Sequence, residues 1–259
     1  MLEFFKSKKG KLIVCIALAI AGIVVIICCN ANQKGSLCKG NSSEYDASLL
    51  TLKEESVMQG DTVVFVGSDF TIGTKADGQS FVDYLKAVDG LNCAVFEKEG
   101  IAITSNKGDS ILSLVESIPK EHASPKAIFC EIPYFQAKSG RKLGELSSSY
   151  MLSDFDTETL IGAMEYIVCY SKMNWGCPVF FYTTAECNSK RYDKVVSSAR
   201  EVANKWNMPM LDFTSINSAG SMDKKQRSLY FVDKHNLSRA GYFEITAPEF
   251  EKFIIKNLY

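Results

Sequence analysis

The sequence predicts an α/β domain whose parallel β-sheet is covered by helices on both faces. Short apolar runs that do not alternate with polar residues recur along the chain, as in strands buried on both faces. Amphipathic stretches of helical length separate these runs, which is typical of parallel strands joined by crossover helices. With 259 residues, 46% of them hydrophobic, the chain can build one such core with an additional N-terminal region.

The expected strands and helices alternate from residue 60 onward. Strands are expected at residues 62–66, 93–96, 127–132, 178–182 and 209–213. Helices are expected at residues 80–88, 110–118, 157–173, 193–206 and 238–255. A further short helix is expected at residues 45–58, because Leu49, Leu50, Leu52 and Val57 follow helical spacing. In such a fold the ligand site lies at the carboxyl ends of the strands.

The first 29 residues predict a membrane anchor. Lysines at positions 6, 8, 9 and 11 precede an uncharged apolar run over residues 12–29. As a helix this run spans roughly 27 Å, close to the hydrocarbon thickness of a bilayer. The basic flank favours a cytoplasmic N-terminus, with the rest of the chain on the other side of the membrane.

We therefore predict a single-pass membrane protein with an extracytoplasmic C-terminal domain. Residues 1–29 form the cytoplasmic lead and signal-anchor helix, residues 30–58 a linker with the short helix, and residues 59–259 the α/β domain. A cleaved signal peptide is one alternative, although its apolar region is usually shorter. A lipoprotein signal is another, but Ile27 and Cys28 precede Cys29 where a small residue is expected.

Composition argues against several classes of partner. The formal net charge is −1 and the chain has no stripe of lysine or arginine, so nucleic acid is not expected to bind. The chain has only two histidines, His122 and His235, and no CxxC pattern, so a histidine-based metal site is not expected. No cofactor is expected either. Cys93, Cys130 and Cys177 lie in or beside expected strands, where cysteine commonly packs as a small hydrophobic residue.

Two motifs at strand ends carry a resemblance to a known family. The strand at residues 62–66 is followed by GSDFTIG at residues 67–73, and DKHNLSRAGY occupies residues 233–242. These blocks resemble the first and last blocks of the SGNH (GDSL-type) hydrolases, and residues 155–183 are similar to a bacterial cell-surface subgroup of them. The resemblance covers roughly residues 60–259. It implies a flavodoxin-like, three-layer sandwich and ester hydrolysis at the strand ends.

The resemblance implies a role for specific positions in the first and second blocks. In the family a serine attacks an ester carbonyl, and N–H groups stabilise the oxyanion. The serine position falls on Asp69, and the aspartate that precedes it falls on Ser68. The oxyanion glycine is kept as Gly100, whereas the oxyanion asparagine falls on Phe135, beside Tyr134. The nucleophile and one oxyanion side chain are therefore replaced.

The last block shows the same mixture. The aspartate that orients the catalytic histidine is kept as Asp233, but the histidine position falls on Asn236. The leading hypothesis is consequently a catalytically impaired relative that binds acylated carbohydrate or another cell-envelope ligand. An active esterase or deacylase is the second hypothesis, because a one-residue shift would let Ser68, His235 and Asp233 form a triad. A structural or protein-binding envelope module is the third.

Three smaller alternatives concern a second Gly-Asp-Ser and the side chains at the strand ends. A literal Gly-Asp-Ser occurs at residues 108–110, but it follows no apolar strand and Asp109 is expected to cap a helix. Asp69, Asp233 and Glu131 are a candidate carboxylate cluster for cation binding or acid–base chemistry. Tyr134 and Phe135 either form an aromatic platform for a ligand or pack into a vacated pocket.

Overall fold

The structure is a computed structural model that describes residues 38–104, 108–120, 125–185, 189–215 and 222–259. The predicted anchor, most of the linker and His122 lie outside these ranges. None of the helices in the described ranges combines the length and the apolar character that a bilayer span requires.

A four-stranded parallel sheet forms the centre of the domain. Its strands are β1 (Thr62–Gly67), β2 (Asn92–Glu97), β3 (Ile128–Ile132) and β4 (Val179–Thr183). They are arranged in the order β2-β1-β3-β4, and every neighbouring pair is parallel. Each matches a predicted strand within a residue or two, so the prediction of a parallel α/β fold is confirmed.

The fifth predicted strand, residues 209–213, is reduced to a single bridge. Leu211 pairs in parallel with Tyr182 at the open edge of β4, which continues the order expected of a flavodoxin-like sheet. Pro209 has no N–H to donate on one side of the bridge. On the other side, the Asp212 carboxylate accepts the Thr214 N–H at 3.0 Å and turns the chain away. The expectation of a full strand was therefore wrong.

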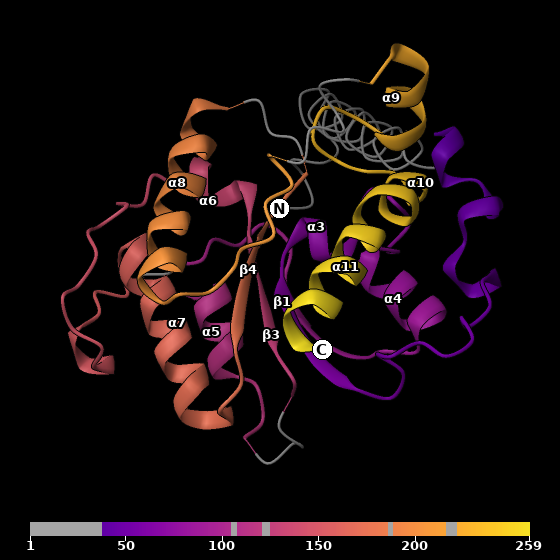
Figure 1. Cartoon of the computed structure of the whole chain (residues 1–259). Helices are drawn as coiled ribbons and strands as arrows, with labels where there is room; N and C mark the ends of the chain where they lie inside the picture. The colour runs from indigo at the N-terminus through magenta and orange to yellow at the C-terminus, as the bar shows by residue number, and fades with distance from the viewer. Residues whose placement is uncertain (1–37, 105–107, 121–124, 186–188, 216–221) are drawn as a thin grey trace, which may run out of the picture.

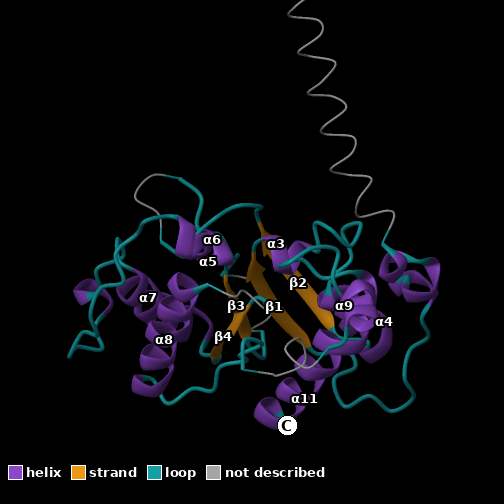
Figure 2. Ribbon diagram, turned by 90° about the horizontal axis from the view of Figure 1, so that it is seen from above, coloured by secondary structure: helices purple, strands orange, loops and turns teal. Residues whose placement is uncertain are grey.

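Helices cover both faces of the sheet (Figures 1 and 2). One layer holds α4 (Phe81–Asp89) and α11 (Ala247–Leu258), and the other holds α5 (Ile111–Glu116), α7 (Leu160–Trp175) and α8 (Lys190–Lys205). Shorter helices are α3 (Asp69–Ile72), α6 (Tyr134–Lys138), α9 (Lys224–Tyr230) and α10 (Arg239–Gly241).

Two apolar cores lie between these layers, because alternate strand residues face opposite sides of the sheet. Val64 and Val66 of β1 belong to the core under α5, α7 and α8. Val63 and Phe65 belong to the core under α4 and α11, which is rich in aromatic rings. Strands buried on both faces explain the uninterrupted apolar runs in the sequence.

Side-chain caps set where several helices begin. Ser80 and Asp83 form a reciprocal capping box at α4, and Thr159 caps α7. At α5 the cap is Ser110, whose hydroxyl accepts the Ser113 N–H at 3.0 Å. The prediction that Asp109 caps this helix was therefore wrong by one residue.

The predicted helix at residues 45–58 was also wrong. The chain forms only two short 3₁₀ turns there, Ser43–Tyr45 and Ala47–Leu49, and residues 50–58 contain no helix. The Asp46 carboxylate accepts the Ser48 N–H at 3.0 Å and the Gln79 side-chain amide at 2.9 Å. These bonds fix a capped turn against the domain, and they outweigh the helical spacing of the leucines.

The last predicted helix is continuous but contains a π-helical turn, Tyr242–Thr246, between α10 and α11. The Tyr242 hydroxyl donates to the Phe70 carbonyl at 2.9 Å and is buried. This bond ties the C-terminal helix to α3, directly after β1. It therefore helps to position the residues at the end of β1.

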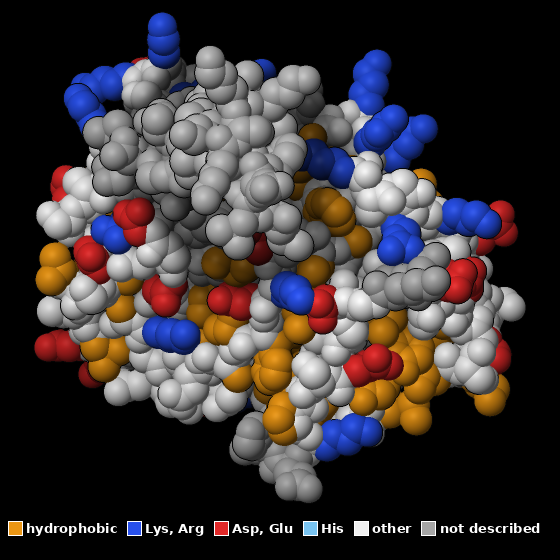
Figure 3. All heavy atoms as spheres, turned by 180° about the vertical axis from the view of Figure 1, so that it is seen from behind, with side chains coloured by type: hydrophobic (Ala, Val, Ile, Leu, Met, Phe, Trp, Pro, Cys, Tyr) orange, Lys and Arg blue, Asp and Glu red, His pale blue; other side chains and the backbone are white. Residues whose placement is uncertain are grey.

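On the face seen in Figure 3, acidic and basic side chains are interspersed among patches of hydrophobic ones, and the visible basic groups form no continuous stripe.

Candidate functional site

A cavity of about 220 Å³ lies at the carboxyl ends of β1 and β3. The chain crosses over in opposite directions on either side of this point, since β2 flanks β1 and β4 flanks β3. Such a switch point leaves a crevice between the loops that follow the two strands. The cavity is lined by Asp69, Phe70, Glu131, Tyr134, Phe135, Lys138, Thr184, His235, Asn236 and Tyr242.

The turn from β1 into α3 is unusually tight. Gly67 has no room for a side chain, because a Cβ there would lie 1.6 Å from Thr71 Oγ1 and 2.8 Å from Glu131 Oε2. Ser68 follows with φ −131° and ψ −141° and is completely buried. Its N–H points to β3 and its hydroxyl donates to Asp69 Oδ2 at 3.2 Å.

Glu131 of β3 holds this turn in place. Its Oε2 accepts the Ser68 N–H at 2.7 Å, the Thr71 N–H at 3.1 Å and the Thr71 hydroxyl at 2.6 Å. The side chain is buried, and this burial raises the pKa of Glu131 to about 7, although the three hydrogen bonds oppose the rise. The nearby Asp69 carboxylate raises the pKa further. The other oxygen, Oε1, is buried with no hydrogen-bond partner.

Asp69 occupies the position that faces the loop after β2. Its Oδ2 accepts the Gly100 N–H at 3.2 Å, in addition to the Ser68 hydroxyl. Gly100 has φ +69°, a left-handed conformation that glycine adopts without strain. A backbone N–H at the end of a neighbouring strand is thus directed at a fixed carboxylate.

The loop before α10 supplies the opposite wall. Asp233 Oδ1 accepts the backbone N–H groups of His235 and Asn236 at 2.8 and 2.9 Å, and its Oδ2 accepts Asn236 Nδ2 at 2.9 Å. Burial alone would raise the pKa of Asp233, but these hydrogen bonds outweigh it and hold the pKa below its usual value. The Asn236 amide is therefore oriented by Asp233.

An aromatic pair forms the rim of the cavity. The rings of Tyr134 and His235 are stacked, with centroids 4.9 Å apart and planes 24° from parallel. The ammonium group of Lys138 lies 4.6 Å from the centroid of the Tyr134 ring. The Nδ1 atom of His235 is buried and has no hydrogen-bond partner. This rim presents flat rings and a few polar atoms to a bound molecule.

Comparison with known proteins finds similarity in the fold but not in the sequence. No protein-family model and no curated protein sequence matches the chain. A protein from Lactobacillus plantarum superposes with a TM-score of 0.63 at 16% identity, covering 77% of this chain and 98% of its own. A GDSL-like lipase from Bacteroides ovatus gives a TM-score of 0.56 at 14% identity, covering 76% and 99%.

A family two carbohydrate esterase from Clostridium thermocellum, solved in complex with cellohexaose, gives a TM-score of 0.53 at 14% identity and covers 77% of this chain and 65% of that one. The fold is SGNH hydrolase-like. At these identities the likeness concerns the backbone, so the chemistry of the site has to be judged from its own side chains.

The SGNH-like fold brings most of the predicted site residues together. Asp69, Tyr134, Phe135, His235 and Asn236 all line the cavity. Gly100 and Asp233 do not line it, but they hydrogen-bond to Asp69 and Asn236 respectively. Phe135 is 42% exposed, so its ring does not fill the cavity.

The hypothetical triad of Ser68, His235 and Asp233 is not assembled in this cavity. Within the described residues, the Ser68 hydroxyl donates to Asp69 and makes no hydrogen bond to His235. Only the backbone N–H of His235, and not its ring, is bonded to Asp233. The ring lies against Tyr134 instead.

Sequence reasoning missed Lys138 and Thr184 and underrated Glu131. Thr184 directly follows β4, so the rule that placed Asp69 at a strand end would also have found it. Lys138 lies in α6, a helix that was not predicted. Glu131 is a charged residue inside an apolar run, which is a signal of either a buried pair or a site.

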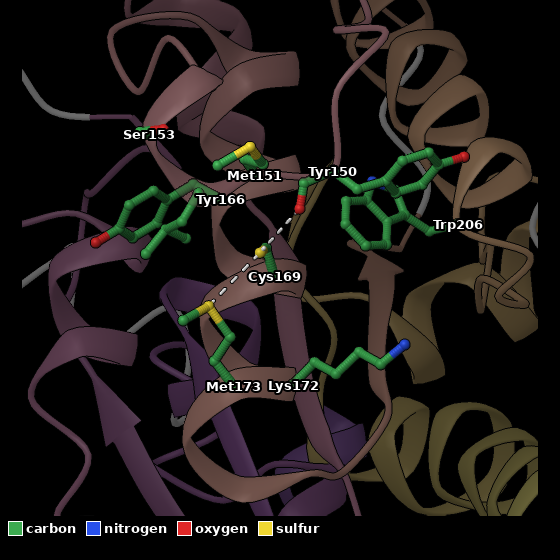
Figure 4. A pocket seen from close by; sticks show the side chains of 9 residues that line it. Tyr150, Met151, Ser153, Tyr166, Cys169, Lys172, Met173 and Trp206 are labelled. Atoms are coloured by element: carbon green, nitrogen blue, oxygen red, sulfur yellow. Dashed lines mark hydrogen bonds between the residues drawn. The ribbon is translucent and has the colours of Figure 1, made fainter.

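A larger apolar hollow of about 980 Å³ lies away from the strand ends. Figure 4 shows Tyr150, Met151, Met173 and Trp206 around it, beside α7. The thiol of Cys169 lies in this hollow and donates to the Tyr150 carbonyl at 3.6 Å. Burial raises the pKa of Cys169, so this thiol is not an activated nucleophile.

Proposed function

We propose that this chain is a non-hydrolytic, ligand-binding protein with an SGNH-like fold, tethered to a membrane by residues 12–29 and acting on the extracytoplasmic side. The proposal rests on the residues that stand where this fold carries its ester-hydrolysing groups. The family's serine, asparagine and histidine are replaced by Asp69, Phe135 and Asn236. We interpret these replacements as a change in the function of the cavity.

The observation that carries the proposal is the hydrogen bond from the Gly100 N–H to Asp69 Oδ2. In ester hydrolysis this N–H has to stabilise a negative oxygen that develops on the substrate. Here the Asp69 side chain of the protein already accepts it. A substrate carbonyl would have to displace that carboxylate, and its developing negative charge would lie beside it.

The opposite wall supports the same conclusion. A general base has to accept a proton, and a histidine in this position does so through a free ring nitrogen. The side-chain amide of Asn236 donates to Asp233 and has no basic nitrogen. The cavity therefore retains the orienting aspartate but presents an amide where proton transfer would be needed.

The proposed ligand class is a carbohydrate or a related polyol of the cell envelope. Tyr134 and His235 bring two aromatic rings to the cavity lining, where the apolar face of a sugar ring can contact them, and Asn236 adds a polar amide. The structurally similar esterase from Clostridium thermocellum was solved with cellohexaose, which places a glycan in a protein of this fold.

The test uses the full-length chain with short-chain aryl esters and a serine-directed fluorophosphonate probe. We expect no turnover above the background rate and no labelling, with Ser68→Ala indistinguishable from the wild type. The double variant Asp69→Ser/Asn236→His restores the serine and the histidine of the family motif. It is the matched comparison for a gain of turnover. Turnover by the wild type that disappears in Ser68→Ala would establish an active esterase and contradict the proposal.

The membrane tether is tested separately. Alkaline carbonate extraction of membranes should leave the full-length chain in the pellet and release a variant that lacks residues 1–29. Protease added outside intact cells should digest the C-terminal domain. Recovery of the wild type in the supernatant would contradict the anchor.

A further inference from the structure

We propose that the cavity binds its polyol ligand through a primary ammonium group held between Glu131 and Asp69. This assignment deepens the proposed function and rests on it, because it requires a ligand site and not a hydrolytic centre. An oxyanion site stabilises a negative charge, whereas this cavity would bind a positive one.

The first reason is an acceptor without a donor. Glu131 is 1% exposed, and its Oε2 is already saturated by donors from Ser68 and Thr71. The remaining oxygen, Oε1, is buried and unpartnered, and the residue lines the cavity. A buried carboxylate oxygen with no partner is costly, so it favours any ligand that supplies a hydrogen-bond donor.

The second reason is a second carboxylate in the same wall. Asp69 uses Oδ2 for Ser68 and Gly100, whereas its Oδ1 accepts no hydrogen bond from the described part of the chain. Each carboxylate thus has one oxygen that accepts no hydrogen bond from the described residues. A hydroxyl group donates one hydrogen bond, but an ammonium group donates three and also neutralises charge, so it fits this pair of acceptors better.

The third reason is that no lysine or arginine of the described ranges forms an ion pair with these carboxylates. Among the described ion pairs, none involves Asp69 or Glu131. Lys138 is the one basic lysine or arginine side chain lining the described cavity, and its ammonium lies over the Tyr134 ring at the rim. The compensating positive charge is therefore left to the ligand.

A divalent metal ion fits less well than an ammonium. The described residues contain no group of three histidine, cysteine, aspartate or glutamate side chains that would hold a metal. The Asp233 carboxylate is occupied by Asn236 and the adjacent backbone. Two carboxylates in a cavity of about 220 Å³ match one small organic cation.

The experiment compares two probes that differ in one group. D-Glucamine carries a primary amine where D-sorbitol carries a hydroxyl, and the rest of the polyol is the same. Isothermal titration calorimetry of the full-length chain at about pH 8 keeps this amine protonated and Glu131 ionised. We expect D-glucamine to bind about tenfold or more tightly than D-sorbitol, since the difference is a charge-assisted hydrogen bond.

Variants localise the effect. In Glu131→Gln the side-chain oxygen can still accept from Ser68 and Thr71, while its NH₂ group replaces the unpartnered Oε1 with a donor, so D-glucamine should bind at least about tenfold more weakly. Asp69→Asn should also weaken binding, and it provides an independent test if Glu131→Gln does not fold. Glu158→Gln makes the same chemical change at an exposed position before α7 and should leave binding unchanged.

Equal binding of the two probes, wild-type affinity in both cavity variants, or no binding of D-glucamine would each overturn the ammonium assignment. None of these results depends on ester chemistry. The proposed function fails on a different readout, namely wild-type ester turnover that requires Ser68. The two failures are therefore distinguishable.

Discussion

Glu165 and Glu131 are both almost completely buried, but their surroundings differ. Glu165 of α7 pairs with Lys205 of α8, and its second oxygen accepts the Ser147 N–H at 3.0 Å. The Lys205 ammonium also donates to the carbonyls of Ser147 and Ser149 at 2.7 and 2.8 Å. Among the described residues Glu131 pairs with no cation, and its Oε1 has no hydrogen-bond partner.

The difference distinguishes a buried carboxylate whose partners all come from the protein from one that lacks a partner on one oxygen. Every group around Glu165 is used internally, and the result is to fasten residues 147–149 across α7 and α8. Glu131 also fastens a turn, through Ser68 and Thr71, but it lines a cavity and leaves one buried oxygen without a donor. A buried polar atom without a partner calls for an explanation, and a ligand that supplies the missing donor is the one we propose for Glu131.

The largest expected effect on stability comes from breaking the ion pair between Glu165 and Lys205. Lys205→Met keeps the length of the side chain but leaves Glu165 buried without its cation. We expect the free energy of unfolding to fall by about 3–5 kcal/mol, the usual cost of an uncompensated buried charge. Urea denaturation followed by tryptophan fluorescence measures this change.

The double variant Glu165→Leu/Lys205→Met is the control for that experiment. Replacing both partners with apolar side chains removes the unpaired charge, so most of the lost stability should return. A single variant that loses less than about 1 kcal/mol would show that the pair is solvated in solution.

The next effect is the pH dependence caused by Glu131. Its pKa of about 7 in the folded protein lies above the ordinary value of about 4.3 that applies in the unfolded chain. The folded state therefore binds this proton more tightly, and the stabilisation is complete below about pH 4.3 and lost as the pH rises through 7. Relative to Glu131→Gln, the wild type should lose about 3 kcal/mol of unfolding free energy between about pH 4 and pH 8.

Other groups near Glu131 have to be separated from it. Asp69 of α3, Lys138 of α6 and His235 share its cavity, and the Tyr182 and Tyr242 side chains lie close to it. Burial raises the pKa of both tyrosines well above their usual value, so they stay neutral in this range. Comparison with Glu131→Gln cancels the remaining groups to first order. Identical pH profiles of the two proteins would contradict the assignment.

The sequence predicted the fold better than the site because the two depend on contacts of different range. Uninterrupted apolar runs report directly on strands such as β1 and β3, since burial on both faces leaves no polar alternation. The helical spacing of apolar residues gave a wrong prediction at residues 45–58. There a hydrogen bond between Asp46 and Gln79, which are distant in sequence, fixes a turn.

The site itself depends almost entirely on such distant pairs. The position of Asp69 after β1 follows from the strand-end rule, but the N–H that it accepts comes from Gly100 in another loop. Glu131 is visible in the sequence as a carboxylate in an apolar run. Its three bonds to Ser68 and Thr71, and its single unpartnered oxygen, become visible only when β1 and β3 lie side by side.

The smallest expected effect concerns an exposed pair, and it tests whether burial or pairing sets the energies above. Lys98 and Asp109 form an ion pair with side chains that are 53% and 54% exposed. Water already solvates both charges, so Lys98→Ala should change the free energy of unfolding by less than about 1 kcal/mol. The remaining difference should shrink in 1 M salt, where the screening length is about 3 Å. Urea denaturation at low and high salt measures it. A loss of more than about 2 kcal/mol would mean that pairing alone stabilises this fold, and the contrast between Glu165 and Glu131 would then no longer depend on their burial.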